Sequence, residues 1–399
     1  MKIHTISELG DVSGKYILLR DDINVQIVDG KITDAFRIKQ SLPTIRDLKK
    51  RGARIAILAH LGRPDGVATP KYSLAPVALA LSELLGEPVP FITDCIGEPV
   101  AAARKNMKNG DVVLLENVRF HAAEEKNDPE FSKQLADGFS LYVNDAFAVS
   151  HRAHASTVGV TKFLPSYAGD LLGCEIKTIS EMMEHPKRPL MGIIAGSKIS
   201  TKIDVIKSLV KLCDTVAVGG GIGNTFKFAL GDKIGNSIYE PSQTNTVLEI
   251  MDLASTHDCK IMTSIDKGTA KVAAADAVRT DKTFDQIEPD DMIFDEGPQS
   301  VKELEDAIDE SKMLIWNGPL GVAEWQPTFS RGTFAIAKHV AERTRAGKLE
   351  SIVGGGDVVA ALEATGTQRD ITYVSTGGGA FLEFIEGKTL PGIAALEIK

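Results

Sequence analysis

Apolar runs that end in glycine recur through the second half of this 399-residue chain. They end at Ala195-Gly196-Ser197-Lys198, Gly219-Gly220-Gly221, Gly354-Gly355-Gly356-Asp357 and Ser375-Thr376-Gly377-Gly378-Gly379. A glycine after a parallel strand permits a tight turn and lets backbone N–H groups approach a ligand. A helix that begins just beyond adds free N–H groups and a partial positive charge. Because phosphate is the usual occupant of such a place, the runs predict a phosphate-binding site built from several loops.

Short β-branched runs alternate with helix-length amphipathic segments along the chain, for example the helical patterns at 40–50 and 74–85. Alternation of this kind predicts right-handed βαβ units and mostly parallel sheets in an α/β fold. The predicted strands are 16–19, 54–59, 112–115, 141–143, 191–194, 215–218, 260–263, 313–316, 351–353 and 371–374.

The length of the chain favours two domains over a single core. A long helix is predicted over 171–185, ending before Pro186, and the loops before it carry Arg and His whereas those after it carry Gly. We therefore predict an N-terminal domain over 1–172 and a C-terminal domain over 173–388 that includes this helix. The tail 389–399 is apolar enough to pack back onto the first domain.

Charge and cysteine usage exclude several classes of protein. A formal net charge of -9 argues against a general nucleic-acid binder, which needs a basic surface. No signal peptide and no apolar run of membrane-spanning length is predicted. The 4 cysteines are scattered without a CxxC pair, so neither a zinc site nor a disulfide framework is indicated, and the cytoplasm is the expected compartment.

Basic side chains follow successive predicted strands in the first half. Ligands of open parallel sheets bind beyond the carboxyl ends of the strands, where these side chains can converge. Arginine offers a planar fork of donors to carboxylate and phosphate oxygens, so the cluster predicts a small, multiply charged anion, although each Arg alone could form a surface ion pair. Asp22 and Asn24 could bind a hydroxyl of that anion. The basic residues are Arg37, His60, Arg63, Arg119 and Arg152.

His151 and His154 have the spacing of a helical metal pair, but no third ligand stands near them in sequence. We expect them to cap a turn or to lie in the core.

Two well-known nucleotide motifs are absent from the sequence. No glycine cluster completes GxGxxG, and the segment from Gly10 to Lys15 is one residue short of a P-loop. The phosphates must then be held by separated loops. Lys198 and Lys202 follow one glycine turn, one helical turn apart, and one of them could reach a transferring phosphoryl group. Two acidic residues each allow two interpretations. Asp357 could hold Mg²⁺ or cap a helix. Glu324 could bind ribose hydroxyls or be a surface acid.

Taken together, the motifs resemble those of phosphoglycerate kinases over essentially the whole chain. The resemblance implies two doubly wound, Rossmann-like parallel-sheet domains joined by a helix and a hinge. It also implies reversible phosphoryl transfer between 1,3-bisphosphoglycerate and ADP, with Mg²⁺, by closure of the hinge, and a monomer. The motifs are Arg20-Asp21-Asp22-Ile23-Asn24-Val25, His60-Leu61-Gly62-Arg63-Pro64-Asp65-Gly66, Leu115-Glu116-Asn117-Val118-Arg119-Phe120, Asn144-Asp145-Ala146-Phe147, His151-Arg152-Ala153-His154, Gly196-Ser197-Lys198, Gly219-Gly220-Gly221, Trp316-Asn317-Gly318-Pro319, Gly354-Gly355-Gly356-Asp357 and Ser375-Thr376-Gly377-Gly378-Gly379.

Roles follow from the resemblance, residue by residue. The glycerate substrate would be bound by Asp22, Ile23, Asn24, Arg37, His60, Leu61, Gly62, Arg63, Arg119 and Arg152. The nucleotide would be bound by Gly196, Lys198, Lys202, Gly220, Asn317, Glu324, Gly355, Gly356, Asp357 and Val358, with Asp357 on the metal. Charge on the transferring group would be stabilised by Arg37, Lys202, Gly356 and Gly379.

Four positions depart from the family pattern: Gln26 replaces Pro, Ala195 replaces Gly, Ala323 replaces Phe, and Val358 replaces Thr or Ser. The Val358 change removes a hydroxyl near the phosphates and predicts weakened nucleotide affinity. A non-catalytic binder of the same ligands and a nicotinamide-dependent dehydrogenase are the alternatives, and the missing dinucleotide fingerprint speaks against the dehydrogenase.

Overall fold

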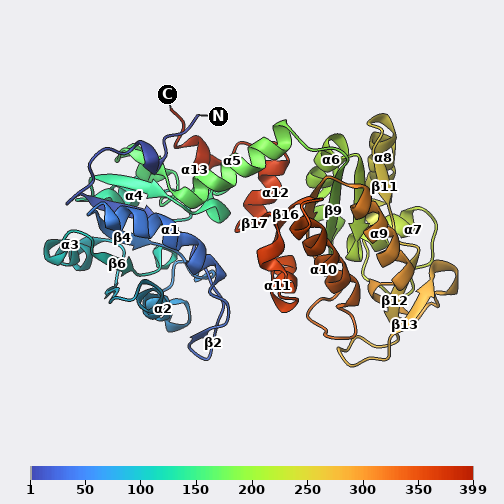
Figure 1. Cartoon of the computed structure of the whole chain (residues 1–399). Coiled ribbons are helices and arrows are strands. Elements are labelled where there is room, and N and C mark those ends of the chain that lie inside the picture. Colours follow the sequence, from blue (N-terminus) through green and yellow to red (C-terminus); the bar gives the residue numbers. More distant parts are fainter. Residues whose placement is uncertain (1, 399) are drawn as a thin grey trace. The chain divides into compact units, whose positions relative to one another are not determined.

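The computed structural model describes residues 2–398, which form two compact units. Unit 1 comprises residues 1–177 and 389–399, and unit 2 comprises residues 178–388 (Figure 1). The contacts thus divide the chain at Lys177, within α5 (Asp170–Glu184), rather than at the predicted residue 172. No helix within residues 2–398 is long and apolar enough to span a membrane.

Unit 1 is built on a six-stranded parallel sheet with strand order β5-β6-β4-β1-β7-β8. Residues Ile17 to Arg20 and Ile55 to Leu58 are buried throughout, as expected of central parallel strands that are covered on both faces. Its elements are β1 (Tyr16–Arg20), β2 (Ile27–Val28), β3 (Lys31–Ile32), α1 (Phe36–Lys50), β4 (Arg54–Leu58), α2 (Ala75–Leu85), β5 (Phe91–Ile92), α3 (Gly97–Asn106), β6 (Val112–Leu115), α4 (Pro129–Ala136), β7 (Leu141–Asn144), β8 (Ser166–Ala168), α5 and α13 (Pro391–Ala394).

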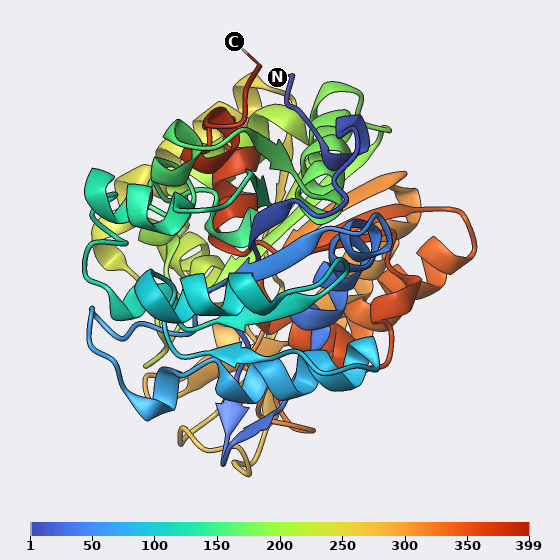
Figure 2. The ribbon, with the colours of Figure 1, turned by 90° about the vertical axis from the view of Figure 1, so that its left-hand side faces the viewer.

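The two ends of the described chain meet in unit 1, as Figures 1 and 2 show. The N–H of Ile398 donates to the carbonyl of Lys2 at 3.0 Å, and Ile3 pairs with Glu397 in an antiparallel bridge. α13 buries Ile393 completely, and the N–H of Gly392 donates to the carbonyl of Ser150 at 2.8 Å.

Unit 2 repeats the parallel scheme, with strand order β11-β10-β9-β15-β16-β17. Its elements are β9 (Leu190–Gly196), α6 (Ile203–Leu212), β10 (Thr215–Gly219), α7 (Gly220–Ala229), α8 (Thr244–Thr256), β11 (Lys260–Met262), β12 (Asp266–Ala270), β13 (Thr280–Thr283), β14 (Met292–Glu296), α9 (Pro298–Glu310), β15 (Met313–Asn317), α10 (Arg331–Arg345), β16 (Glu350–Gly354), α11 (Gly356–Ala364), β17 (Tyr373–Ser375) and α12 (Gly379–Ile385).

These two sheets confirm the predicted α/β class with doubly wound parallel sheets. The prediction missed an antiparallel sheet in unit 2, with order β13-β12-β14. Its strands have sequences such as Asp266–Ala270 and Thr280–Thr283, which mix charged, polar and small residues and lack the apolar runs by which the parallel strands were found.

Candidate active site

The loops that carry the basic residues of unit 1 follow neighbouring strands. In the sheet Arg20, the last residue of β1, is paired with Leu58 of β4 on one side and with Asn144 of β7 on the other. β6 pairs with β4 in turn. Because the strands are parallel, their carboxyl ends share one edge, and the following loops meet there.

Direct contacts join several of the predicted residues at this edge. Arg37, in the first turn of α1, forms a 2.6 Å ion pair with the buried carboxylate of Asp22. The side-chain oxygen of Asn24 accepts the N–H of Gly62 at 2.9 Å, and the guanidinium of Arg119 donates to the carbonyl of Gly62 at 2.9 Å. Loops after three strands are thereby tied into one surface.

Gly62 is required by this geometry. Its φ is +61°, and a Cβ atom there would lie 2.4 Å from the ring of Tyr72. Any other residue would therefore displace the loop that carries Arg63 and contacts Asn24.

The histidines near this edge are neutral near pH 7. Burial and the neighbouring charges of Arg20, Arg119 and Arg37 lower the pKa of His60 well below its usual range. Burial and nearby arginines also lower the pKa of His151 and of His154 to about 4. His154 is buried and His151 half-buried, which agrees with the core or capping role expected of the pair.

Two of the predicted arginines keep their charge uncompensated. Arg63 and Arg152 are exposed, and within residues 2–398 neither guanidinium forms an ion pair. Ile23 and Leu61, in contrast, belong to the hydrophobic core of unit 1, so only their backbone groups can serve a ligand. At Arg63 and Arg152 the edge thus presents positive charge without matching carboxylates, as a multiply charged anion requires.

In unit 2 the polar centre is Lys202, at the point where the strand order reverses. β9 leads to β10 and β11 on one side, and β15 leads to β16 and β17 on the other. The ammonium of Lys202 donates to the carbonyl of Ala195 at the end of β9 and to the side-chain oxygen of Asn317 at the end of β15, both at 2.7 Å. Asn317 in turn donates to the carbonyl of Gly354 in β16.

The lysine charge is thus fixed across the topological switch point, where ligands of doubly wound sheets bind. Desolvation lowers the pKa of Lys202 to about 8, and the carboxylate of Asp357 opposes this shift. Lys198 is exposed and has no such anchoring within the described residues.

A large cavity of about 870 Å³ opens beside this point, within unit 2. The volume lies in the range of small-molecule sites. Gly196, Gly220, Glu324 and Asp357 line it among the predicted residues. Its apolar wall comes from the β14 strand and the loop after β15, in the residues Met292, Ile293, Phe294, Leu320, Val322, Ala323 and Trp325.

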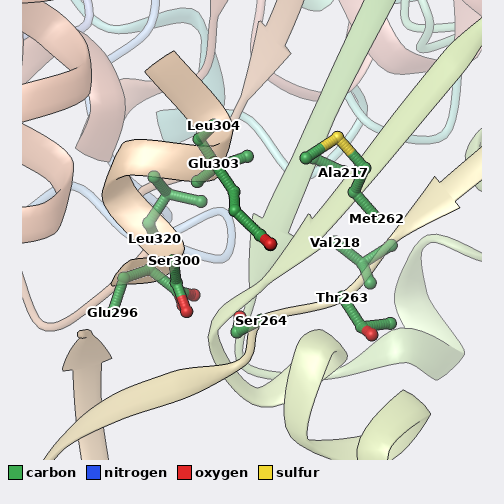
Figure 3. Close-up of a pocket in the computed structure, with 10 residues that line it drawn as sticks. All are labelled: Ala217, Val218, Met262, Thr263, Ser264, Glu296, Ser300, Glu303, Leu304 and Leu320. Carbon is green, nitrogen blue, oxygen red and sulfur yellow. The ribbon is translucent and has the colours of Figure 1, made fainter. Parts of the chain in front are cut away.

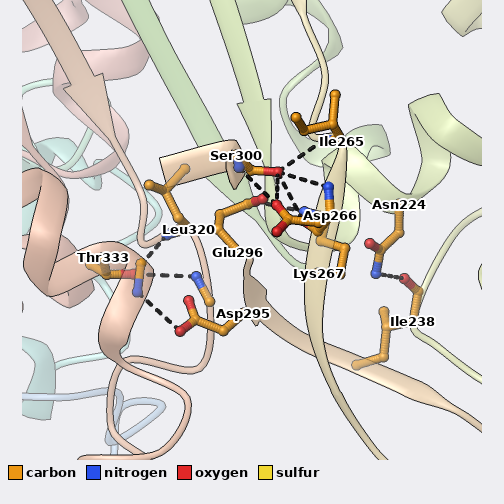
Figure 4. Close-up of polar contacts among 12 residues, drawn as sticks. Asn224, Ile238, Ile265, Asp266, Lys267, Asp295, Glu296, Ser300, Leu320 and Thr333 are labelled. Atoms are coloured by element: carbon orange, nitrogen blue, oxygen red, sulfur yellow. Dashed lines mark hydrogen bonds and ion pairs between the residues drawn. The ribbon is translucent and has the colours of Figure 1, made fainter. Parts of the chain in front are cut away.

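Buried polar contacts hold the strand β14 that forms this wall (Figure 4). The ammonium of Lys267 and the carboxylate of Glu296 pair at 2.6 Å with both side chains 1% exposed. Asp295 accepts from Arg279 at 2.6 Å and from the N–H of Gly332 at 3.0 Å. Such partners offset the desolvation cost of buried charges, so these pairs fix the wall in place.

A second cavity lies nearby, between the helix that carries Ser300 and Leu304 and the strands that carry Val218 and Met262 (Figure 3). Its volume is only about 10 Å³. This is close to the space that a single water molecule occupies, so it is no ligand site.

Asp357 and Val358 face in different directions, although they are neighbours in the first turn of α11. Asp357 is exposed and lines the large cavity. Val358 is 0% exposed and packs in the hydrophobic core of unit 2 with Trp316 and Leu362. The Val358 side chain is therefore absent from the cavity wall, and only its backbone can approach a ligand.

The other predicted departures divide in the same way. Ala195 is fully buried in the core of unit 2 and does not line the cavity, so its methyl group narrows no ligand space there. Ala323 does line the cavity.

Two of the predicted glycines lie at helix starts. Gly356 begins α11 and Gly379 begins α12, where the first helix N–H groups have no partner within the helix.

The sequence profile of the phosphoglycerate kinase family matches residues 6–388. The chain belongs to the phosphoglycerate kinase family. Curated members include the phosphoglycerate kinase of Methylorubrum populi, 48% identical over 395 residues, which cover 99% of this chain and 98% of that protein. The Caulobacter vibrioides protein of the same name is 47% identical over 390 residues, 98% of each chain.

Solved phosphoglycerate kinases share the fold over nearly the whole length. The structure from Coxiella burnetii superposes with a TM-score of 0.86 at 39% identity and covers 99% of both chains. That from Pyrococcus horikoshii has a TM-score of 0.87 at 29% identity, covering 99% of this chain and 98% of the other. This likeness disfavours the dehydrogenase alternative.

Sequence reasoning missed two parts of this kinase-family site. The apolar cavity wall has no motif, because its residues lie on two short segments joined only by folding. Arg20 belongs to one of the motifs but no role was predicted for it, although it is 1% exposed and one of its guanidinium nitrogens lies 3.2 Å from Nδ1 of His60. The available signal was an arginine directly after the apolar run 16–19, at the end of a strand expected to be buried, since buried arginines need fixed partners.

Proposed function

We propose that the two sites described above bind the substrates of reversible phosphoryl transfer between 1,3-bisphosphoglycerate and ADP, which yields 3-phosphoglycerate and ATP. The observation that carries this assignment is Lys202, an ammonium held at the switch point beside a nucleotide-sized cavity. Membership of the phosphoglycerate kinase family supports the reaction. By the same resemblance we expect a cytoplasmic monomer.

The glycerate site is assigned to the basic edge of unit 1. Arg63 and Arg152 supply uncompensated charge, and Arg37 and Arg119 are already oriented by Asp22 and Gly62. Since each guanidinium can bind two oxygens of a phosphate or carboxylate, the edge suits a substrate with both groups. The backbone of Ile23, Leu61 and Gly62 and the side chains of Asp22, Asn24 and His60 complete it.

The nucleotide site is assigned to the cavity of unit 2. The glycine turns at Gly196, Gly220 and Gly355–Gly356 leave room for phosphates beside Lys198 and Lys202, and Asn317 fixes Lys202. Glu324, exposed on the cavity wall, is the acceptor for ribose hydroxyls. The backbone N–H of Val358 belongs to the first turn of α11 and supports the phosphates from there.

Asp357 fits the requirements of Mg²⁺ bound to a nucleotide. Mg²⁺ in such sites takes one or two carboxylates and completes its shell with phosphate oxygens and water. Asp357 offers an exposed carboxylate on the cavity wall, within electrostatic reach of Lys202. When bound there, the ion neutralises negative charge on the phosphates.

The chemistry requires positioning and charge stabilisation rather than a base. The attacking group in the ATP-consuming direction is already a carboxylate, so no proton needs removal. Arg37, Lys202 and the helix starts at Gly356 and Gly379 stabilise charge on the transferring group. Because the two sites belong to different units, transfer requires that the units bring their ligands together.

A coupled assay of ADP formation from ATP and 3-phosphoglycerate tests the assignment. We expect turnover that requires both substrates and Mg²⁺. Asp357→Asn should lower kcat/KM by roughly 100-fold or more and raise the Mg²⁺ requirement, as loss of a metal ligand does. The surface variant Asp306→Asn, which removes only an exposed helix ion pair, is the control. Ligand binding without turnover in the parent protein would identify a non-catalytic binder instead.

A further inference from the structure

A buried set of hydrogen bonds lies behind His60, and we name its members, Arg20, Ser156 and Glu124, the Arg20 network. Arg20 ends β1 and is 1% exposed. One guanidinium nitrogen lies 3.2 Å from Nδ1 of His60. Arginine has donors and no acceptor, so Nδ1 of His60 must accept. The proton of the neutral imidazole is then on Nε2.

The rest of the Arg20 network fixes the guanidinium. Nε of Arg20 donates to the hydroxyl of Ser156 at 2.9 Å. That hydroxyl donates to one oxygen of Glu124 at 2.5 Å, and the N–H of Ser156 donates to the other oxygen at 2.8 Å. Ser156 and Glu124 are both 0% exposed.

The direction of these hydrogen bonds is set by the chemistry of the two ends. Arginine only donates, so the serine hydroxyl accepts from Arg20 and directs its own proton toward the carboxylate of Glu124. Burial raises the pKa of Glu124, and the charge of Arg20 and the two hydrogen bonds from Ser156 oppose this shift and favour the carboxylate. A buried guanidinium needs a compensating negative charge, and the buried carboxylate of Glu124 supplies it to Arg20 within the same hydrogen-bonded network.

We propose that Glu124, acting through Ser156 and Arg20, is a positioning residue that holds His60 in the Nε2–H tautomer, so that the imidazole donates to an oxygen of the anionic substrate. In the other tautomer Nε2 would present a lone pair to that oxygen and repel it. This inference rests on the proposed glycerate site. The tautomer matters because burial and the surrounding charges of Arg20, Arg119 and Arg37 lower the pKa of His60 and keep the ring neutral.

The tautomer is measured directly by long-range ¹H–¹⁵N correlation spectra of the ¹⁵N-labelled full-length protein. His60 is assigned by the loss of its signals in His60→Gln. We expect an Nε2–H ring in the parent protein. In Ser156→Ala and Glu124→Gln, we expect a mixture of the two tautomers. If the parent protein shows the Nδ1–H tautomer of His60, this result alone overturns the inference, and the variants need not be measured.

Kinetics separate positioning from general stability. Ser156→Ala and Glu124→Gln should raise KM for 3-phosphoglycerate roughly tenfold, the effect of one weakened hydrogen bond to a charged group, while KM for ATP stays unchanged. The matched control is Ser132→Ala, a fully buried serine whose hydroxyl bonds only a backbone carbonyl, that of Asp128. We expect parent kinetics and a parent His60 tautomer in this control.

Folded network variants that keep the parent tautomer would overturn the inference. If the proposed function were wrong, the parent protein would show no turnover, yet the spectra would still test the role of the Arg20 network in setting the tautomer. If the function were right and the inference wrong, turnover would be present and the tautomer would not respond to Ser156→Ala.

Discussion

At the scale of single residues, the sites combine charges that are fixed with charges that are free. Arg37 and Lys202 are held by Asp22 and Asn317, whereas Arg63 is exposed and unpaired within residues 2–398. Fixed charges cost no reorganisation when charge develops on a transferring group. The charged residues of the two sites could be predicted from the sequence, because arginine and lysine that follow the ends of parallel strands are well placed to bind phosphate. Their partners could not, since Lys202 and Asn317 are far apart along the chain.

Lys202 makes the nucleotide site sensitive to alkaline pH. Because desolvation lowers the pKa of Lys202 to about 8, the free protein loses this charge as the pH rises through that value. We expect KM for ATP to rise between about pH 7 and about pH 9, while KM for 3-phosphoglycerate changes less. Steady-state kinetics at constant ionic strength measure both constants.

The variant Lys202→Arg is the control, because a guanidinium stays charged throughout this range. Its KM for ATP should be nearly independent of pH, and an equal pH dependence of this KM in variant and parent would contradict the assignment.

The same lowered pKa affects stability in the opposite direction, because it makes the folded protein more stable as the pH rises. The unfolded chain binds more protons at Lys202 between its lowered pKa and the ordinary value of 10.5, so this group makes unfolding less favourable as the pH rises.

At the scale of elements, most of the parallel strands could be predicted, whereas the short edge strands β5 and β8 and the antiparallel sheet were missed. Parallel strands such as β6 (Val112–Leu115) are apolar throughout because both faces are covered. In the β13-β12-β14 sheet, the strand β14 forms part of the wall of the large cavity. Its pairing depends on contacts such as that between Lys267 and Glu296, which no local pattern reveals.

The first turn of α11 shows how orientation changes a prediction. The sequence indicated that Val358 weakens nucleotide binding through a missing hydroxyl, but the side chain is buried in the core. We now expect Val358→Thr to lower the free energy of unfolding by about 1–3 kcal/mol, because it buries a hydroxyl, and to leave KM for ATP unchanged. Thermal denaturation and kinetics measure the two effects.

Val359→Thr, at the next buried position of the same helix, is the matched control. We expect it to lower the free energy of unfolding to a similar extent and to leave KM for ATP unchanged. A fall in KM for ATP in Val358→Thr alone would show that the hydroxyl reaches the phosphates after all.

At the scale of the whole molecule, the chain returns to its first unit at its end. Residues 389–398 bury Leu390, Ile393 and Leu396, and Gly392 bonds the carbonyl of Ser150, two residues before Arg152. The tail therefore supports the loop that carries one of the free arginines.

Deletion of residues 389–399 should destabilise unit 1 more than unit 2. Each fully buried Leu or Ile contributes about 1.5–3 kcal/mol, so we expect a clearly lower Tm. KM for 3-phosphoglycerate should rise, and KM for ATP should change little. Thr389→Ala, an exposed position at the start of the tail, is the control. A truncated protein with the parent Tm and substrate KM would contradict this role.

Each ligand should protect its own unit. We expect 3-phosphoglycerate alone to slow amide hydrogen exchange in the loops after β1 and β4, and ADP with Mg²⁺ to slow it at the starts of α7 and α11. Exchange measured by mass spectrometry on the full chain tests this. Protection of the unit 1 loops by ADP alone would contradict the assignment of the two sites.

The sequence by itself determined the alternation of strands and helices, the glycine turns and the residue types that follow each strand, because these features are written in local periodicity and backbone freedom. Only the tertiary structure decided the partners. Arg20 and Glu124 belong to one buried network, and Lys202 donates a hydrogen bond to Asn317. The side chain of Val358 packs in the core, whereas Asp357 lines the cavity. Residues of β14 form part of the cavity wall. These depend on burial and on contacts between distant segments, which no local pattern contains.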